Sequence, residues 1–160
     1  MSVHVIYGSD GGTTRGIAQR LASRLQGRAI DITKASVADL ESPALLILGC
    51  PTYGFGDLQS DWEDRLSLLK EAQLSGKRVA LFGTGDQMTY PDTFVDAMGI
   101  LYDIVVDRGA QVVGFTDTKG YDHTGSAAQR DGRFVGLALD EDQQPTLTDQ
   151  RLTAWIDQIR

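Results

Sequence analysis

The chain has 160 residues, of which 41% are hydrophobic and 23% charged, and this length and composition predict one folded domain over residues 1–160. Acidic residues outnumber basic ones by 22 to 15, and the net charge of −7 argues against a protein that binds nucleic acid through its phosphate backbone. One cysteine and two histidines provide neither an internal disulfide nor zinc-ligand spacing, so we expect no metal site.

Short apolar runs alternate with segments of helical period along the chain. This alternation predicts an α/β fold in which helices cover both faces of a parallel sheet. In chain order, the expected elements are a strand over 3–7, helix 14–26, strand 29–32, helix 36–41, strand 44–50, helix 58–69, strand 77–83, helix 91–109, strand 111–115 and helix 148–160.

Three of these elements carry further information. The run over 44–50 is almost continuously apolar, as expected for a central strand that is buried on both faces. Pro91 is placed as a first-turn proline of its helix, and Gly109 as the terminator. The strand pattern that begins at 111–115 resumes at 134–139, so a polar segment over 117–133 interrupts the fifth strand.

The turn after the first strand reads Gly-Ser-Asp-Gly-Gly-Thr-Thr, at 8–14. Its glycines let the backbone approach a bound group, its hydroxyls donate hydrogen bonds, and the helix N-terminus adds unpaired amides with partial positive charge. The turn has neither the lysine of an ATP-type loop nor the Gly-x-Gly-x-x-Gly spacing of a dinucleotide loop. The pattern therefore predicts a cradle for an anion.

The turns after the third and fourth strands, at 51–57 and 84–90, each contain a tyrosine. Tyr53 lies near glycines at the end of a strand, a poor position for core packing and a good one for stacking on a flat ligand. Tyr90 offers a second ring on the neighbouring turn. Ligands of such sheets bind outside the carboxyl ends of the strands. A phosphate cradle beside two aromatic rings describes a site for flavin mononucleotide (FMN).

These segments resemble the flavodoxin family, and specifically its long-chain branch. The first turn resembles the family's Thr-x-Thr-Gly-x-Thr phosphate loop, and the later segments resemble its two flavin loops and the long-chain insertion with its return strand. The similar segments lie in order along nearly the whole chain, at 8–14, 49–53, 58–62, 82–87 with Tyr90, 120–122 and 134–142.

The resemblance implies a flavodoxin-like three-layer sandwich with a five-stranded parallel sheet in the order 2-1-3-4-5, and one non-covalently bound FMN. Two departures from the family pattern stand out: Gly11 replaces a usual threonine, and Tyr53 stands where many long-chain members carry tryptophan. The implied phosphate contacts are Ser9, Asp10, Gly11, Gly12, Thr13 and Thr14, and the implied flavin contacts are Pro51, Thr52, Tyr53, Gly54, Phe55, Gly56, Thr84, Gly85, Asp86, Tyr90, Thr93, Phe94 and Asp142.

The implied function is that of a low-potential one-electron carrier, which shuttles FMN between its semiquinone and hydroquinone states and has no substrate reaction of its own. The implied partners are redox proteins with basic docking surfaces: a reductase such as ferredoxin-NADP reductase, and an acceptor such as nitrogenase reductase, which is compatible with nitrogen fixation. We expect a monomer. Because the sequence has no leader pattern and no apolar run of roughly 18 residues, we also expect a cytoplasmic protein without a membrane contact.

Acidic residues near the predicted site, and a glycine of the second turn, suggest how the redox potentials of the flavin are set. Acidic residues near the predicted site should disfavour negative charge on the reduced ring and steer the protein to basic partners. Gly54 tolerates positive φ, so we expect the Gly54–Phe55 peptide to respond to the redox state. The acidic residues in question are Asp57, Asp61, Glu63, Asp64 and Asp86.

Two other functions fit the same architecture. An FMN-dependent NAD(P)H-quinone reductase would need an open ring face, whereas Tyr53 and Tyr90 are expected to cover both faces of the ring. A response-regulator receiver, which is a phosphorylation switch, needs an aspartate at the end of the third strand, where this chain has Cys50-Pro51-Thr52. The carrier is therefore the preferred hypothesis.

Overall fold

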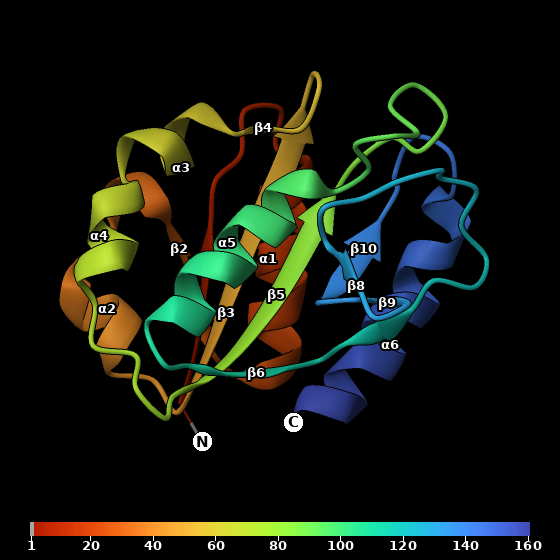
Figure 1. Ribbon diagram of the computed structural model, residues 1–160. Helices are drawn as coiled ribbons and strands as arrows, with labels where there is room; N and C mark the ends of the chain where they lie inside the picture. Colours follow the sequence, from red (N-terminus) through yellow and green to blue (C-terminus); the bar gives the residue numbers. More distant parts are fainter. Residues whose placement is uncertain (1) are drawn as a thin grey trace.

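The computed structural model describes residues 2–160 and has a parallel sheet between two layers of helices (Figure 1). Five strands form the central path of this sheet, and every neighbouring pair among them is parallel. In spatial order they are β2 (Arg28–Asp31), β1 (Val3–Tyr7), β3 (Leu45–Tyr53), β5 (Arg78–Thr84) and β10 (Leu137–Leu139).

The fifth strand of the sheet is interrupted, as the sequence predicts. Strand β6 (Gln111–Val113) pairs with the start of β5, and β10 pairs with its end. The two pieces are therefore parts of one fifth strand, and the order 2-1-3-4-5 is confirmed. The intervening segment forms a small antiparallel sheet of β7 (Thr116–Asp117), β9 (Arg133–Phe134) and β8 (Gln129–Arg130).

Alternating side chains of the central strands build two hydrophobic cores. On β3, Leu45 and Ile47 face one core, and Leu46 and Leu48 face the other, because successive side chains of a strand point to opposite faces. Helices α1 (Thr13–Leu25) and α6 (Thr148–Ile159) cover the first core. The second core is covered by α2 (Val37–Glu41), α3 (Ser60–Asp64), α4 (Leu66–Glu71) and α5 (Asp96–Asp107) (Figure 1).

The helix predicted over 58–69 is divided in the structure. Leu58 lies in the two-residue strand β4 (Asp57–Leu58), which pairs antiparallel with the end of β3 and extends that strand to Tyr53. The backbone leaves the helical path at Arg65, whose guanidinium donates to carbonyl oxygens of the 3₁₀ turn η1 (Ile32–Lys34) and the residue after it. These tertiary contacts override the helical period of the apolar residues.

The helix expected from Pro91 begins five residues later, at Asp96. The Pro91 carbonyl accepts hydrogen bonds from the amides of Thr124 and Gly125, which belong to the segment between β7 and β8, so residues 91–95 follow an irregular path. Gly109 follows the helix with φ of +82° and ends it as predicted. A second 3₁₀ turn, η2 (Pro145–Leu147), precedes α6, and no helix within residues 2–160 is long and apolar enough to cross a membrane.

Candidate functional site

The three predicted turns meet at the carboxyl ends of β1, β3 and β5, where they surround a cavity of about 320 Å³. In the described part of the chain, no cationic side chain lines it. Glu141 is the one lining residue that the sequence argument did not select. The lining residues are Ser9, Gly11, Thr13, Thr14, Pro51, Thr52, Tyr53, Thr84, Gly85, Asp86, Tyr90, Glu141 and Asp142.

The first turn presents amides and hydroxyls to one end of this cavity. Gly12, the N-cap residue of α1, has φ of +92°, and its amide donates to the Ser9 hydroxyl at 3.0 Å. No side chain of residues 2–160 caps the helix, so its remaining first-turn amides stay available to a ligand. A Cβ added at Gly11 or Gly12 would meet no atom within 4 Å, so both glycines border open space. This end of the cavity fits an anion held by neutral donors.

Asp10 belongs to the same turn, but its carboxylate is engaged by protein groups outside the cavity lining. It accepts a 2.9 Å hydrogen bond from Gln59 Nε2. Burial, together with the negative charge of Asp10, raises the pKa of Tyr53. The Asp10 side chain therefore braces the turn, which leaves its backbone amide as the group available to a ligand.

Gln59 is a structural residue of the site that the sequence argument missed. Its side chain is fully buried, donates to Asp61 Oδ2 at 2.9 Å as well as to Asp10, and accepts from the Trp62 amide at 3.2 Å. A Cβ at Gly8 would lie 2.2 Å from Gln59 Oε1, so that glycine makes room for the amide. No local pattern signals this role, because Gln59 and Asp10 are 49 residues apart.

The second turn carries two exposed aromatic side chains. Tyr53 lines the cavity and is 39% exposed, whereas Phe55 is 90% exposed and lies outside the cavity lining. Gly54 and Gly56 both have positive φ, +52° and +97°, as the reversal between β3 and β4 requires. The turn is anchored on α5, because the Ala97 amide donates to the Thr52 hydroxyl at 2.9 Å.

The third turn contributes Asp86 and Tyr90 to the lining. Burial opposes the ionisation of Asp86, but hydrogen bonds from Thr89, Gln143 and Met88 outweigh burial and lower its pKa. Thr84, at the end of β5, is hydrogen bonded to Thr14 through the two hydroxyls at 3.1 Å. This contact joins the third turn to the start of α1.

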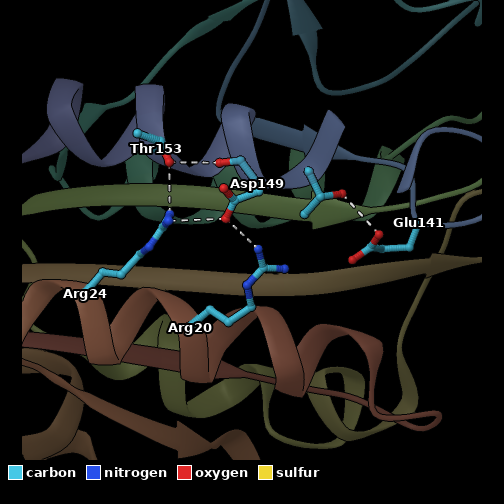
Figure 2. Close-up of polar contacts among 6 residues, drawn as sticks. Arg20, Arg24, Glu141, Asp149 and Thr153 are labelled. Carbon is cyan, nitrogen blue, oxygen red and sulfur yellow. Dashed lines mark hydrogen bonds and ion pairs between the residues drawn. The ribbon is translucent and has the colours of Figure 1, made fainter. Parts of the chain in front are cut away.

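Carboxylates gather on one side of the cavity. Burial, followed by the negative charges of Asp86, Asp140 and Glu141, raises the pKa of Asp142. Glu141 accepts a hydrogen bond from the Thr148 hydroxyl at 3.1 Å. Figure 2 shows Glu141 together with the ion pairs of Asp149. Negative charge on a ligand at this side would therefore be disfavoured.

Some predicted residues do not line the cavity. Asp10, Gly12, Gly54, Phe55 and Gly56 belong to the first two turns but lie outside the lining, as does Thr93 after the third turn. The side chain of Phe94 is 1% exposed and packs against Tyr121, His123 and Phe134 at centroid distances of 5.7, 5.4 and 6.0 Å. Phe94 is therefore a core residue, because the segment over 117–133 covers it.

Comparisons with known proteins agree with this architecture. Residues 5–155 match the family model described as Flavodoxin. Flavodoxin from Nostoc sp. is 44% identical over 161 residues, which cover 99% of this chain and 95% of the relative. Flavodoxin 1 from Escherichia coli K12 is 44% identical over 160 residues, which cover 97% of this chain and 90% of the relative.

A solved structure gives the same result. The crystal structure of Fusobacterium nucleatum flavodoxin bound to flavin mononucleotide is similar with a TM-score of 0.93 and 35% identity, over 99% of this chain and 96% of that chain. Family model, relatives and solved structure all span nearly the whole chain. The chain therefore belongs to the flavodoxin family.

Proposed function

We propose that this protein carries single electrons between redox enzymes by means of a non-covalently bound FMN, held in the cavity at the carboxyl ends of β1, β3 and β5. The observation that carries this proposal is the continuity of one cavity from an anion cradle to two tyrosine rings. When bound, FMN supplies a ring that accepts and releases electrons one at a time.

The chain's own residues fit the two ends of FMN. Hydroxyls of Ser9, Thr13 and Thr14, with the free amides at the start of α1, would bind the phosphate. At roughly 1.5–3 kcal/mol for each hydrogen bond to a charged group, five or six such donors suffice for tight binding without a cation. Tyr53 and Tyr90 would contact the ring system and exclude water from it.

Three carboxylates that line the cavity set its electrostatic potential. Asp86, Glu141 and Asp142 line the cavity and oppose the addition of negative charge. We therefore expect the second electron to enter at a strongly reducing potential. A penalty of about 3 kcal/mol against the negative charge lowers a one-electron potential by roughly 130 mV.

Redox proteins are the partners of such a carrier. We infer that the exposed rim formed by Asp57, Glu63, Asp64 and the less exposed Asp61 docks on basic surfaces, such as those of a ferredoxin-NADP reductase or a nitrogenase reductase, and that the protein acts as a cytoplasmic monomer. Phe55, 90% exposed beside this rim, would add apolar contact.

Salt dependence tests the docking proposal. We expect the rate of electron transfer to a basic partner to fall as ionic strength rises, and the fall to be shallower in an Asp57→Asn, Glu63→Gln, Asp64→Asn variant, since fewer charges then steer the encounter. Stopped-flow kinetics between 20 and 500 mM salt measures both slopes. Equal slopes for parent and variant would place the docking surface elsewhere.

Anaerobic photoreduction of the FMN-reconstituted protein tests the main proposal. We expect one FMN per chain, two resolved one-electron steps and no oxidation of NAD(P)H. A single two-electron step with rapid NAD(P)H oxidation would instead identify a quinone reductase. Failure to bind FMN would remove the carrier function altogether.

A further inference from the structure

The segment 11–30 differs from the rest of this acidic chain, because it contains four arginines and no acidic residue. The structure divides these arginines into two pairs. Arg20 and Arg24 both donate to Asp149, at 3.0 and 3.2 Å, which joins α1 to α6 (Figure 2). Arg15 and Arg28 have no ion pair and no hydrogen bond from their side chains within residues 2–160.

The second pair borders a cavity of about 550 Å³ that runs along β2, the edge strand of the sheet. Lys34 also lines this cavity, and its ammonium group likewise has no ion pair within residues 2–160. None of the residues that line it also lines the proposed FMN cavity. The full lining is Tyr7, Arg15, Arg28, Ala29, Ile30, Asp31, Lys34 and Asp39.

Two carboxylates line the same cavity, and both bind groups of their own local turns. Asp31 Oδ1 accepts from the amide and hydroxyl of Thr33 at 2.9 and 2.8 Å. Asp39 Oδ2 accepts from the Ser36 amide at 2.9 Å in the capping box of α2. This hydrogen bond lowers the pKa of Asp39 more than the nearby charge of Arg28 does. Three cations therefore face two engaged carboxylates, which leaves an excess of positive charge.

Tyr7 adds a neutral hydrogen-bond donor to these cationic groups. Its side chain is 7% exposed and lines the cavity, yet its hydroxyl has no hydrogen-bond partner in the described part of the chain. This oxygen is not enclosed, because His123 Nδ1 is the only fully buried side-chain N or O atom without a partner among the described residues, so the Tyr7 hydroxyl is free to donate to a ligand. A phenol together with guanidinium and ammonium groups is a donor set suited to a doubly charged oxyanion.

We propose that the cavity between the start of α1 and strand β2 binds a phosphate-type oxyanion, either free or carried on a small organic molecule. Arg15 and Arg28 bind the anion through their guanidinium groups, Lys34 adds a third charge, and Tyr7 donates a hydrogen bond. This site is separate from the cradle of the first turn, which lies between Tyr7 and Arg15 in the sequence.

Isothermal titration of the FMN-loaded protein tests the proposal, because the cofactor's own phosphate then fills the first-turn cradle. The probes are inorganic phosphate and glycerol phosphate, each compared with sodium chloride at equal ionic strength. We expect saturable binding of at least one phosphate probe and none of chloride. Binding of inorganic phosphate identifies a free oxyanion, and binding of glycerol phosphate alone identifies an ester; either result supports the site.

Variants locate the binding. We expect Arg28→Gln and Tyr7→Phe each to weaken phosphate binding by about tenfold or more, as loss of a hydrogen bond to a charged group predicts. Arg24→Gln is the matched control, because it removes the same charge from a residue already paired with Asp149. We expect this control to change binding by less than twofold.

Three results would overturn the proposal: no saturable phosphate binding to the loaded protein, equal weakening by Arg24→Gln and Arg28→Gln, or full binding in Tyr7→Phe. If the protein failed to take up FMN, the electron-carrier proposal would fail instead. Phosphate binding to the unloaded protein that is insensitive to Arg28→Gln would then report the first-turn cradle.

Discussion

At the second turn, single residues decide what the backbone can do. Gly54 has φ of +52°, in the left-handed region that costs other residues roughly 1–2 kcal/mol. A Cβ there would meet Asp57 Oδ2 at 3.3 Å, so steric crowding is mild and the conformational cost dominates. The sequence predicts that the Gly54–Phe55 peptide responds to the redox state, and that role stays a prediction.

We expect Gly54→Ala to shift the first one-electron potential by about 40 mV or more, because a penalty that differs by about 1 kcal/mol between the two orientations of the peptide corresponds to that shift. Spectroelectrochemical titration measures both potentials. Gly76→Ala is the matched control, since Gly76 also has positive φ, +72°, with open space around its Cβ position. Unchanged potentials in Gly54→Ala would contradict the assignment.

His123 presents a different problem at the same scale. Its Nε2 is hydrogen bonded to Gln129 at 2.7 Å, but its Nδ1 is buried beside the rings of Phe94, Tyr121 and Phe134 and has no hydrogen-bond partner within residues 2–160. An unpaired buried polar atom lowers stability by about 1–3 kcal/mol. An aromatic hydrocarbon ring would fill the same space without that penalty.

We expect His123→Phe to raise the free energy of unfolding of the apoprotein by about 1 kcal/mol. Urea denaturation followed by circular dichroism measures the change. His4→Phe is the contrasting variant, because His4 Nδ1 is hydrogen bonded to the Asp39 carbonyl at 2.7 Å and its loss should destabilise the protein. A destabilised His123→Phe protein would show that loss of the Gln129 hydrogen bond outweighs the gain from removing the unpaired Nδ1.

Between elements, the site depends on side chains that tie separate turns together. Gln59, just before α3, holds the first turn through its hydrogen bond to Asp10. The hydroxyl of Thr52, in the second turn, accepts a hydrogen bond from the Ala97 amide of α5. The segment after β7 holds the third turn, since Thr124 and Gly125 donate to the Pro91 carbonyl. Each turn of the site is therefore positioned by an element that is distant in sequence.

We expect Gln59→Met to weaken FMN binding by about tenfold, because it keeps the volume of the side chain but removes its bonds to Asp10 and Asp61. Quenching of FMN fluorescence on titration with apoprotein measures the affinity. Gln73→Met, at an exposed position, is the control and should bind normally. An unchanged affinity in Gln59→Met would mean that the first turn holds its shape without the amide.

Across the whole molecule, charge is unevenly distributed. The acidic residues that give the net charge of −7 lie outside segment 11–30, in which every charged side chain is an arginine, and carboxylates cluster around Asp142 at the site. Burial and the neighbouring carboxylates raise the pKa of Asp142. Its charged form is therefore disfavoured in the folded protein relative to the unfolded chain, and this cost is present only above the pH range in which it titrates.

We expect Asp142→Asn to raise the Tm of the apoprotein at pH 7, and the gain to shrink as the pH falls from 6 towards 4. The direction of this effect follows from the raised pKa of Asp142. The folded protein binds the Asp142 proton more tightly than the unfolded chain does, so the ionised carboxylate destabilises the folded protein increasingly as the pH rises. Thermal unfolding over this pH range measures it. A gain that grew on acidification would contradict the cited shift.

The sequence by itself determined the layout of the molecule. Strand segments are marked by alternating apolar residues or by continuous apolar runs, and amphipathic helical segments separate them. These patterns are local, and they decide which residues can form a buried parallel sheet. The interrupted fifth strand, the end of α5 at Gly109 and most of the cavity lining were predictable for that reason. Turns that follow neighbouring parallel strands must also converge at one edge of the sheet.

Tertiary contacts decided what local pattern could not. The division of the predicted helix at Arg65, the late start of α5 and the burial of Phe94 each depend on a partner segment far along the chain. No sequence pattern marks Gln59 or Tyr7. Gln59 depends on the carboxylate of Asp10, and Tyr7 on the cations that line the same cavity, and only folding brings these groups together. Hydrophobic period specifies a face of an element, whereas hydrogen-bond partners and charge clusters exist only once the elements have packed.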